Sequence, residues 1–197
     1  ENYRSTMPDS EYGPLTYQES RRLNQNRSGV AVVLSSRSLG LELLPTLIEK
    51  WHELQPAGFE QLPSDIQDVR RFRDRLDALT SRDKGDRWTC VFRPEFGQPN
   101  QLADLVRTAL EKCELARSED IQLRVILIFD PSSTRLWSEL SPDLSEPLEE
   151  RCYSWLAAGP WKRVAIRRRL EQFDSVPATE DNIDKLLEVT QGWPMLM

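Results

Sequence analysis

The feature that most constrains the fold of this chain is a run at residues 123–129, LRVILIF, that is apolar at every position except Arg124 and is rich in β-branched residues. A shorter run of the same kind, VAVVL, lies at residues 30–34. Strands that are apolar at nearly every position must be covered on both faces, as interior strands of a parallel sheet are. We therefore predict that both runs are interior strands of a mostly parallel sheet.

Weaker strand patterns and amphipathic helix patterns alternate with these two runs along the chain. Further strands are expected at residues 59–62, 88–92 and 152–156. Helices are expected at residues 16–28, 39–54, 63–79, 99–115, a short stretch after Pro131, 161–173 and 179–190. This alternation predicts an α/β fold with helices on both faces of the sheet, and ligand sites at the carboxyl ends of the strands.

Composition narrows the class of protein. The chain has 197 residues, 39% hydrophobic and 29% charged, which is typical of a globular domain with at most a small appendage. No apolar run approaches the roughly 20 residues of a membrane helix. The net charge of −6 argues against a general nucleic-acid binder. We expect no membrane association.

Cysteine and histidine usage limits the chemistry. The three cysteines, Cys90, Cys113 and Cys152, form no C-x-x-C pair, and their odd number fits a reducing, cytoplasmic compartment. Because His52 is the single histidine, this chain cannot by itself form a metal centre or catalytic site that needs two histidines. We expect no bound metal.

The segment after the first apolar run has the strand–loop–helix setting of a phosphate-binding loop, whose pattern is G-x-x-x-x-G-K-[ST]. Residues 35–42 read SSRSLGLE. On that pattern Gly40 keeps the second glycine, whereas Ser35, Leu41 and Glu42 replace the first glycine, the lysine and the Ser/Thr. One interpretation is an ATPase fold that has lost the groups that bind and hydrolyse nucleotide, with a vestigial loop that also includes Ser36. The other is an ordinary βα turn.

The end of the chain resembles the lid of STAND-type ATPases, the signalling branch related to AAA+ proteins. Gly192-Trp193-Pro194, after a regular helix, matches the family's GxP motif. The resemblance implies that Pro194 lies against an adenine, that residues 30–34 form the P-loop strand, and that residues 88–92 form the Walker B strand. Residues 123–129 would be the sensor-1 strand. We expect Trp193 and Pro194 to pack on the lid.

The departures from this family concern the groups that perform hydrolysis. A Walker B strand should end in an acid that binds magnesium, but here the strand is followed by Arg93-Pro94-Glu95. Asp130 ends the sensor-1 strand and is either a displaced Walker B acid or the cap of the turn that follows it. We expect no catalytic residue. If the domain does hydrolyse ATP, Asp130 and Glu95 are the candidate catalytic acids.

Two groups of charged residues have a structural and a functional interpretation. The first group mixes arginines and aspartates within one predicted helix, which indicates a solvated, salt-bridged helix face. Its members are Arg70, Arg71, Arg73 and Arg75 with Asp65, Asp68, Asp74 and Asp77. The second is a basic patch, which is either a helix exterior balanced by Glu171 and Asp174 or a contact for an acidic partner or nucleic acid. The patch comprises Lys162, Arg163, Arg167, Arg168 and Arg169.

These observations favour a piece of a larger protein: a leader or loop at 1–15, a P-loop-like core at 16–158 and a helical lid at 159–197. We expect a non-hydrolysing pseudo-ATPase module, regulatory or scaffolding, without cofactor, whose partners are other domains of the same polypeptide or other proteins. One alternative is an active STAND-type ATPase that binds ATP and Mg²⁺ and uses Asp130. The other is a nucleic-acid interaction module that uses the Arg167–Arg169 face.

Overall fold

A computed structural model describes residues 15, 17–23, 28–52, 58–63, 66, 68–81, 87–160, 163–171 and 177–190. Its centre is a five-stranded sheet in the order β2-β3-β4-β1-β5, in which every neighbouring pair is parallel. The strands are β1 Gly29–Leu34, β2 Gly58–Gln61, β3 Arg87–Phe92, β4 Gln122–Phe129 and β5 Ser154–Ala157. The prediction that the two apolar runs form interior strands is confirmed, because β1 lies between β4 and β5, and β4 between β3 and β1.

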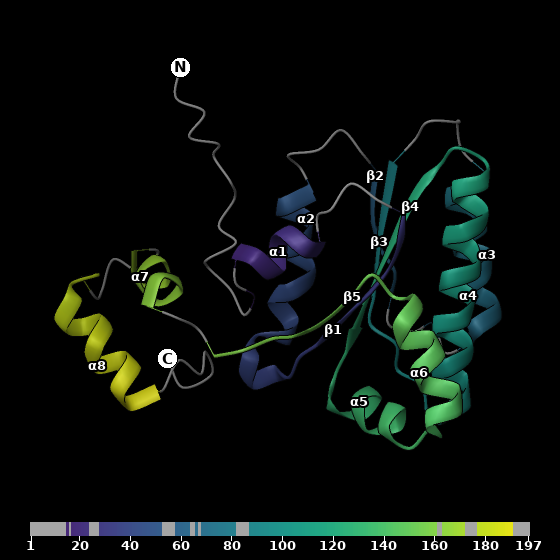
Figure 1. Cartoon of the computed structure of the whole chain (residues 1–197). Helices are drawn as coiled ribbons and strands as arrows, with labels where there is room; N and C mark the ends of the chain where they lie inside the picture. The colour runs from purple at the N-terminus through teal and green to yellow at the C-terminus, as the bar shows by residue number, and fades with distance from the viewer. Residues whose placement is uncertain are drawn as a thin grey trace.

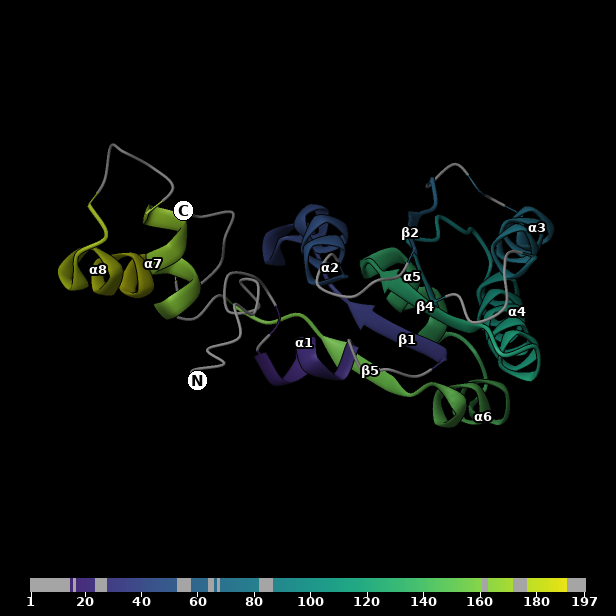
Figure 2. The ribbon, with the colours of Figure 1, turned by 90° about the horizontal axis from the view of Figure 1, so that it is seen from above.

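Helices cover both faces of the sheet, which makes three layers (Figures 1 and 2). Helices α1 Tyr17–Leu23 and α2 Leu44–His52 lie on one face. The other face carries α3 Val69–Thr80, α4 Pro99–Ser118, α5 Pro131–Ser138 and α6 Pro142–Arg151. Both faces of β1 and β4 are therefore covered, as their apolar sequences require.

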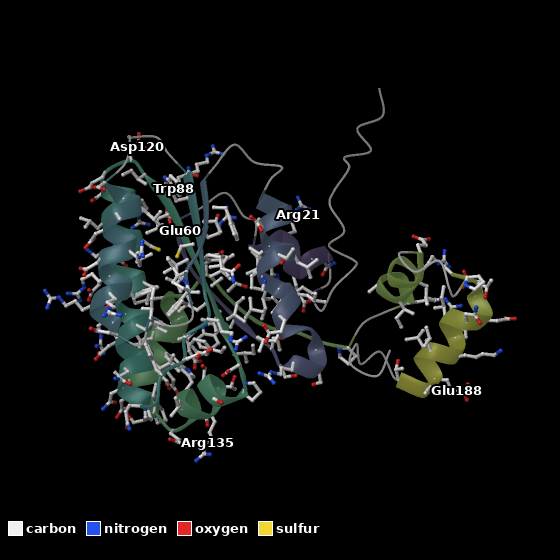
Figure 3. The ribbon with its side chains drawn as sticks, turned by 180° about the vertical axis from the view of Figure 1, so that it is seen from behind. Arg21, Glu60, Trp88, Asp120, Arg135 and Glu188 are labelled. Carbon is white, nitrogen blue, oxygen red and sulfur yellow. The ribbon has the colours of Figure 1, made fainter. Side chains whose placement is uncertain are left out.

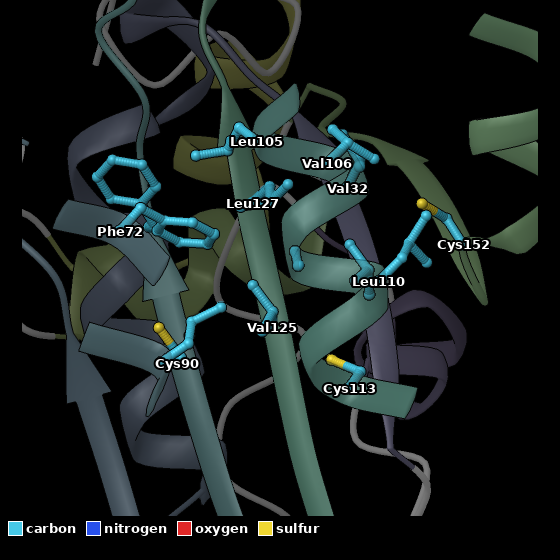
Figure 4. Packing of buried hydrophobic residues seen from close by; sticks show 14 of the residues in the cluster. Val32, Phe72, Cys90, Leu105, Val106, Leu110, Cys113, Val125, Leu127 and Cys152 are labelled. Carbon is cyan, nitrogen blue, oxygen red and sulfur yellow. The ribbon is translucent and has the colours of Figure 1, made fainter. Parts of the chain in front are cut away.

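The larger core lies between the sheet and α4. Val32, Val125 and Leu127 on the strands pack against Leu105 and other apolar side chains of α4 (Figure 4). Pro99 begins α4 at a position where a proline fits, since its missing N–H would have no helical partner there.

Aromatic side chains extend this core to both sides. Phe72 of α3 stacks on Phe92 of β3 with ring centroids 5.2 Å apart, and both are fully buried. Trp137, Trp155 and Phe129 form a second aromatic group near the carboxyl ends of β4 and β5. Trp137 and Trp155 are therefore packing residues of the core.

The three cysteines are buried thiols of this larger core and form no disulfide (Figure 4). Burial raises the pKa of Cys113 and of Cys152 to about 12, and it also raises the pKa of Cys90. A thiol with so high a pKa is a weak nucleophile near neutral pH.

The edge of the sheet at β2 depends on a close approach between two strands. Trp88 of β3 lies directly across from Gly58 in the parallel ladder, and its indole ring covers the glycine. A Cβ atom at position 58 would come within 2.2 Å of the Trp88 ring, so only glycine fits there. Figure 3 shows Trp88 toward the end of the sheet that also carries Asp120.

The last two helices, α7 Arg163–Glu171 and α8 Glu180–Thr190, form a hairpin with a small core of its own. Its buried side chains are Ala165, Ile166, Leu170 and Ile183. Figures 1 and 2 show the hairpin to one side of the sheet, beyond α2.

Three local predictions need correction. The helix expected from residue 39 begins at Leu44, because Gly40 takes a left-handed conformation (φ 84°) and divides residues 37–43 into two 3₁₀ turns. The helix expected from Pro63 begins at Val69, where the Asp68 side chain caps it. Helix α6 was not predicted, since its two prolines and many acids obscure the apolar pattern.

Candidate functional site

The site that the sequence singled out lies at the carboxyl ends of β1, β3 and β4, where ligands bind in parallel α/β sheets. The loop after β1 begins at Ser35, whose backbone N–H donates to the Phe129 carbonyl of β4 at 2.9 Å. The Ser36 and Ser38 hydroxyl oxygens are 2.8 Å apart and share a hydrogen bond. One hydrogen bond thus attaches the loop to the sheet, and another joins two side chains within the loop.

The backbone amides of this loop donate to carbonyls of the same loop. Leu39 and Leu41 donate to the Ser36 carbonyl at 2.9 and 3.0 Å, and Gly40 donates to Arg37 at 3.1 Å. Leu43 donates to the Gly40 carbonyl at 2.9 Å. A phosphate cradle requires such N–H groups to point at the ligand, whereas these four are occupied within two 3₁₀ turns.

Two residues that the sequence marked at separate positions meet in the structure. A guanidinium nitrogen of Arg93, just after β3, lies 3.0 Å from a carboxylate oxygen of Glu42, in the loop after β1. The second terminal nitrogen lies 3.4 Å from Glu95. Because β4 separates β3 from β1, this ion pair crosses a whole strand at the carboxyl edge. The sequence showed opposite charges near the ends of two strands, but it did not show that Arg93 and Glu42 would form an ion pair.

A hollow of about 460 Å³ opens beside this ion pair, between α2 and the ends of β2, β3 and β4. Its wall includes Leu41, Thr46, Gln61 and Ile128 as well as the paired charges. Two buried polar atoms flank the loop without a hydrogen-bond partner among the described residues: the Ser35 hydroxyl oxygen and Nε of Arg93.

Asp130 caps a helix. One of its carboxylate oxygens accepts a hydrogen bond of 2.8 Å from the backbone N–H of Ser133, in the first turn of α5. The buried Ser133 hydroxyl donates to the Pro94 carbonyl at 3.1 Å, which connects α5 to the segment after β3. Of the two interpretations of Asp130 from sequence, the geometry matches the capping one.

Two members of the basic patch pair with acids from the neighbouring helix. Arg163 contacts Glu180, with the closest approach at 2.5 Å, and it also contacts Asp184; Arg167 contacts Glu180. The acids that pair with these two arginines come from α8. Lys162, Gly192, Trp193 and Pro194, and the side chains of Arg168 and Arg169, lie outside the described residues.

The ion pairs of the hairpin predict a loss of stability at acid pH. Hydrogen bonds from Arg163 lower the pKa of Glu180 and of Asp184 below their ordinary values of about 4. Because the folded-state pKa is the lower one, this stabilisation is complete above the ordinary value and is lost as the pH falls through the folded-state value.

Hydrogen exchange of α7 and α8 should therefore be constant from about pH 7 to pH 5, after correction for intrinsic rates, and should accelerate below about pH 4. The variant Asp184→Asn should show a weaker acid effect. Equal pH dependence in the variant and the unmodified protein would contradict the assignment to these carboxylates.

The described residues contain no group of three or more His, Cys, Asp or Glu side chains placed to hold a metal ion. Within the same residues, no helix is both long enough and apolar enough to cross a membrane.

Comparison with solved structures identifies the fold. Trip13 from Rhizobiales superposes with a TM-score of 0.53 over 91% of this chain and 63% of that one, at 11% identity. The chain has a P-loop-NTPase-like fold. A chain of the E. coli MS115-1 HORMA:CdnC:Trip13 complex superposes with a TM-score of 0.52, also at 11% identity, over 83% of this chain and 56% of that one. This chain thus spans less than two thirds of either. The sequence matches no protein-family model and no curated protein.

Proposed function

We propose that this chain is a non-hydrolysing P-loop-like module that serves a regulatory or scaffolding role in a larger protein. The observation that carries the proposal is the ion pair between Arg93 and Glu42 at the carboxyl edge of the sheet. The resemblance to STAND-type ATPases would place a magnesium ligand at one of these positions and a Ser/Thr at the other.

The charges at this edge oppose those that MgATP needs. A site for this ligand combines acidic or hydroxyl oxygens for the metal with a lysine for the outer phosphates. Here the cation is Arg93, the anion is Glu42, and Leu41 stands where the lysine would be. The Arg93 side chain is only 25% exposed, so its charge is held at the strand end. We infer that the chain satisfies these charges internally and that MgATP does not fit the residues present.

The loop geometry supports the same proposal. Its amides donate to loop carbonyls, and Glu42 adds a negative charge just before α2, where the positive end of the helix dipole would otherwise attract a phosphate. A phosphate would have to compete with these loop hydrogen bonds for the amides. Hydrolysis by this architecture rests on positioning and charge stabilisation, so a loop closed on itself removes the main catalytic contribution.

The competing functions have less support. Asp130, which an active ATPase would use, is engaged with the Ser133 amide. The nucleic-acid interpretation used the basic patch, but two of its arginines are engaged with acids of α8. We propose a lid role for the α7–α8 hairpin on the basis of its separate core. The three unpaired thiols support a reducing, cytoplasmic location.

The proposed partners are other domains of the same polypeptide or separate proteins. One solved structure of similar fold is a complex that contains HORMA and CdnC, which supports protein assembly as a role for domains of this shape. The limited coverage of that chain supports the view that further segments accompany this one in the full protein.

Calorimetry with ATP and Mg²⁺, followed by a phosphate-release assay, tests the proposal. We expect neither magnesium-dependent binding nor turnover above background. The variant Leu41→Lys/Glu42→Thr/Arg93→Asp restores the expected charges, and it should gain weak magnesium-dependent binding if only the charges were lost. Micromolar binding by the unmodified chain, with turnover that Asp130→Ala abolishes, would instead establish an active ATPase.

A further inference from the structure

The arginines of α3 are not neutralised by the aspartates of the same helix. The Asp68 side chain caps the helix by accepting from the Arg70 amide at 2.8 Å. Asp77 pairs with Lys112 of the neighbouring helix α4. The expected face is solvated, since all four of its arginines are exposed. Its salt bridges are not seen: within the described part of the chain, the guanidinium groups of Arg70, Arg71, Arg73 and Arg75 have no ion pair or hydrogen bond.

Arg71 and Arg75 form a stripe on the outer side of this helix. They are one helical turn apart, and both are exposed. At about 100° per residue, they lie roughly 120–160° around the axis from Asp77, and thus away from α4. Phe72, Leu76 and Leu79 occupy the buried side. Figures 1 and 2 show α3 on the outside of the molecule, beside α4.

This arrangement is unfavourable for an isolated helix. Like charges four residues apart destabilise a helix, and Arg75 has no acid three or four residues away on either side, where side chains on a helix meet. A pair of carboxylates from outside would relieve the repulsion, because each guanidinium offers a planar set of donors that matches a carboxylate.

We propose that the Arg71–Arg75 stripe docks an acidic, helical segment of a protein partner, with two carboxylates one turn apart. Arginine is enriched at protein interfaces, where its stem packs and its head forms directed pairs. A continuous polyanion fits less well, because it carries more negative charge than a segment with two carboxylates and is repelled more strongly by Asp74 on the same exposed face and by the net charge of −6. The stripe is independent of the carboxyl-edge site and of any nucleotide.

The test uses four fluorescently labelled probes in anisotropy titrations at low ionic strength. They are a 20-residue alanine-based peptide with glutamates four residues apart, the same peptide with glutamine, the same with lysine, and a 20-nucleotide oligo-dT. The unmodified protein should bind the glutamate peptide and not the glutamine peptide. Raising the salt from about 0.03 to 0.3 M should weaken the binding several-fold, because exposed charge pairs are screened.

The variant Arg71→Glu/Arg75→Glu should lose about tenfold or more in affinity for the glutamate peptide and gain affinity for the lysine peptide. The matched control Arg21→Glu/Arg22→Glu removes two exposed arginines of α1 and should stay within about twofold. If the charge reversal perturbs the circular dichroism spectrum, Arg71→Gln/Arg75→Gln serves as the second variant.

Three outcomes would overturn the proposal. The first is equal or absent binding of the glutamate and glutamine peptides. The second is a loss in the α1 control as large as that in the α3 variant, which would indicate general charge attraction. The third is tighter binding of oligo-dT than of the glutamate peptide with the same dependence on Arg71 and Arg75, which would assign the stripe to phosphate groups.

Discussion

Replacement of Phe92 by alanine should destabilise the domain by about 3–5 kcal/mol, the usual cost of deleting a fully buried aromatic side chain. Phe92 is 0% exposed, stacks on Phe72 and immediately precedes Arg93. The cavity would open between β3 and α3, where the neighbouring side chains are themselves fixed by packing. Urea unfolding should show a midpoint about 1.5–2.5 M lower, from an m-value of about 2 kcal/mol per molar.

Leu115 of α4 provides the matched control, because its side chain is 45% exposed in the same layer of helices. Leu115→Ala should change the free energy of unfolding by less than about 0.5 kcal/mol. Similar losses in the two variants would show that Phe92 is not the packing centre described.

Replacement of Ile166 by aspartate should unfold the α7–α8 hairpin and leave the sheet intact. Ile166 is fully buried in a small cluster, which has four buried apolar side chains among the described residues, so one unpaired charge there removes most of the apolar contact between the helices. Hydrogen exchange of α7 and α8 should approach the rate of an unfolded chain, while β4 and α4 keep their protection.

Val189→Asp on α8 is the control, since Val189 is 78% exposed. Its exchange pattern should match that of the unmodified protein. A loss of protection in β1 and β4 of the Ile166→Asp variant would mean that hairpin and sheet fold as one unit, against the proposed lid.

The interior strands were predictable because their nearly continuous apolar residues indicate burial on both faces. The run at 123–129 is apolar enough to require cover on both faces, and β4 is the middle strand of the sheet. Helix α4 was predictable for a similar reason, with Pro99 marking its start. Helix α6 was not, because only Leu148 of its side chains is buried and Pro147, a residue that rarely occurs inside helices, lies within it.

The candidate site was predictable residue by residue but not as a geometry. Glu42 and Arg93 were recognised as unsuitable for magnesium and phosphate from their charges alone. Their contact depends on strand order, which places β4 between their two strands, and no local pattern encodes that order. The interpretation of α3 failed for a related reason: helical spacing suggested pairs within α3, whereas Asp77 pairs with Lys112 of another helix.

The labelling rates of the buried thiols should report how often each part of the core opens. A thiol-reactive dye added at neutral pH should label Cys90 and Cys113 only when the layer of helices over β3 and β4 separates from the sheet, because thiolate and access are both lacking in the closed state. Cys152, next to the edge strand β5, should be labelled first. Mass spectrometry of the labelled peptides would time each event without any engineered probe.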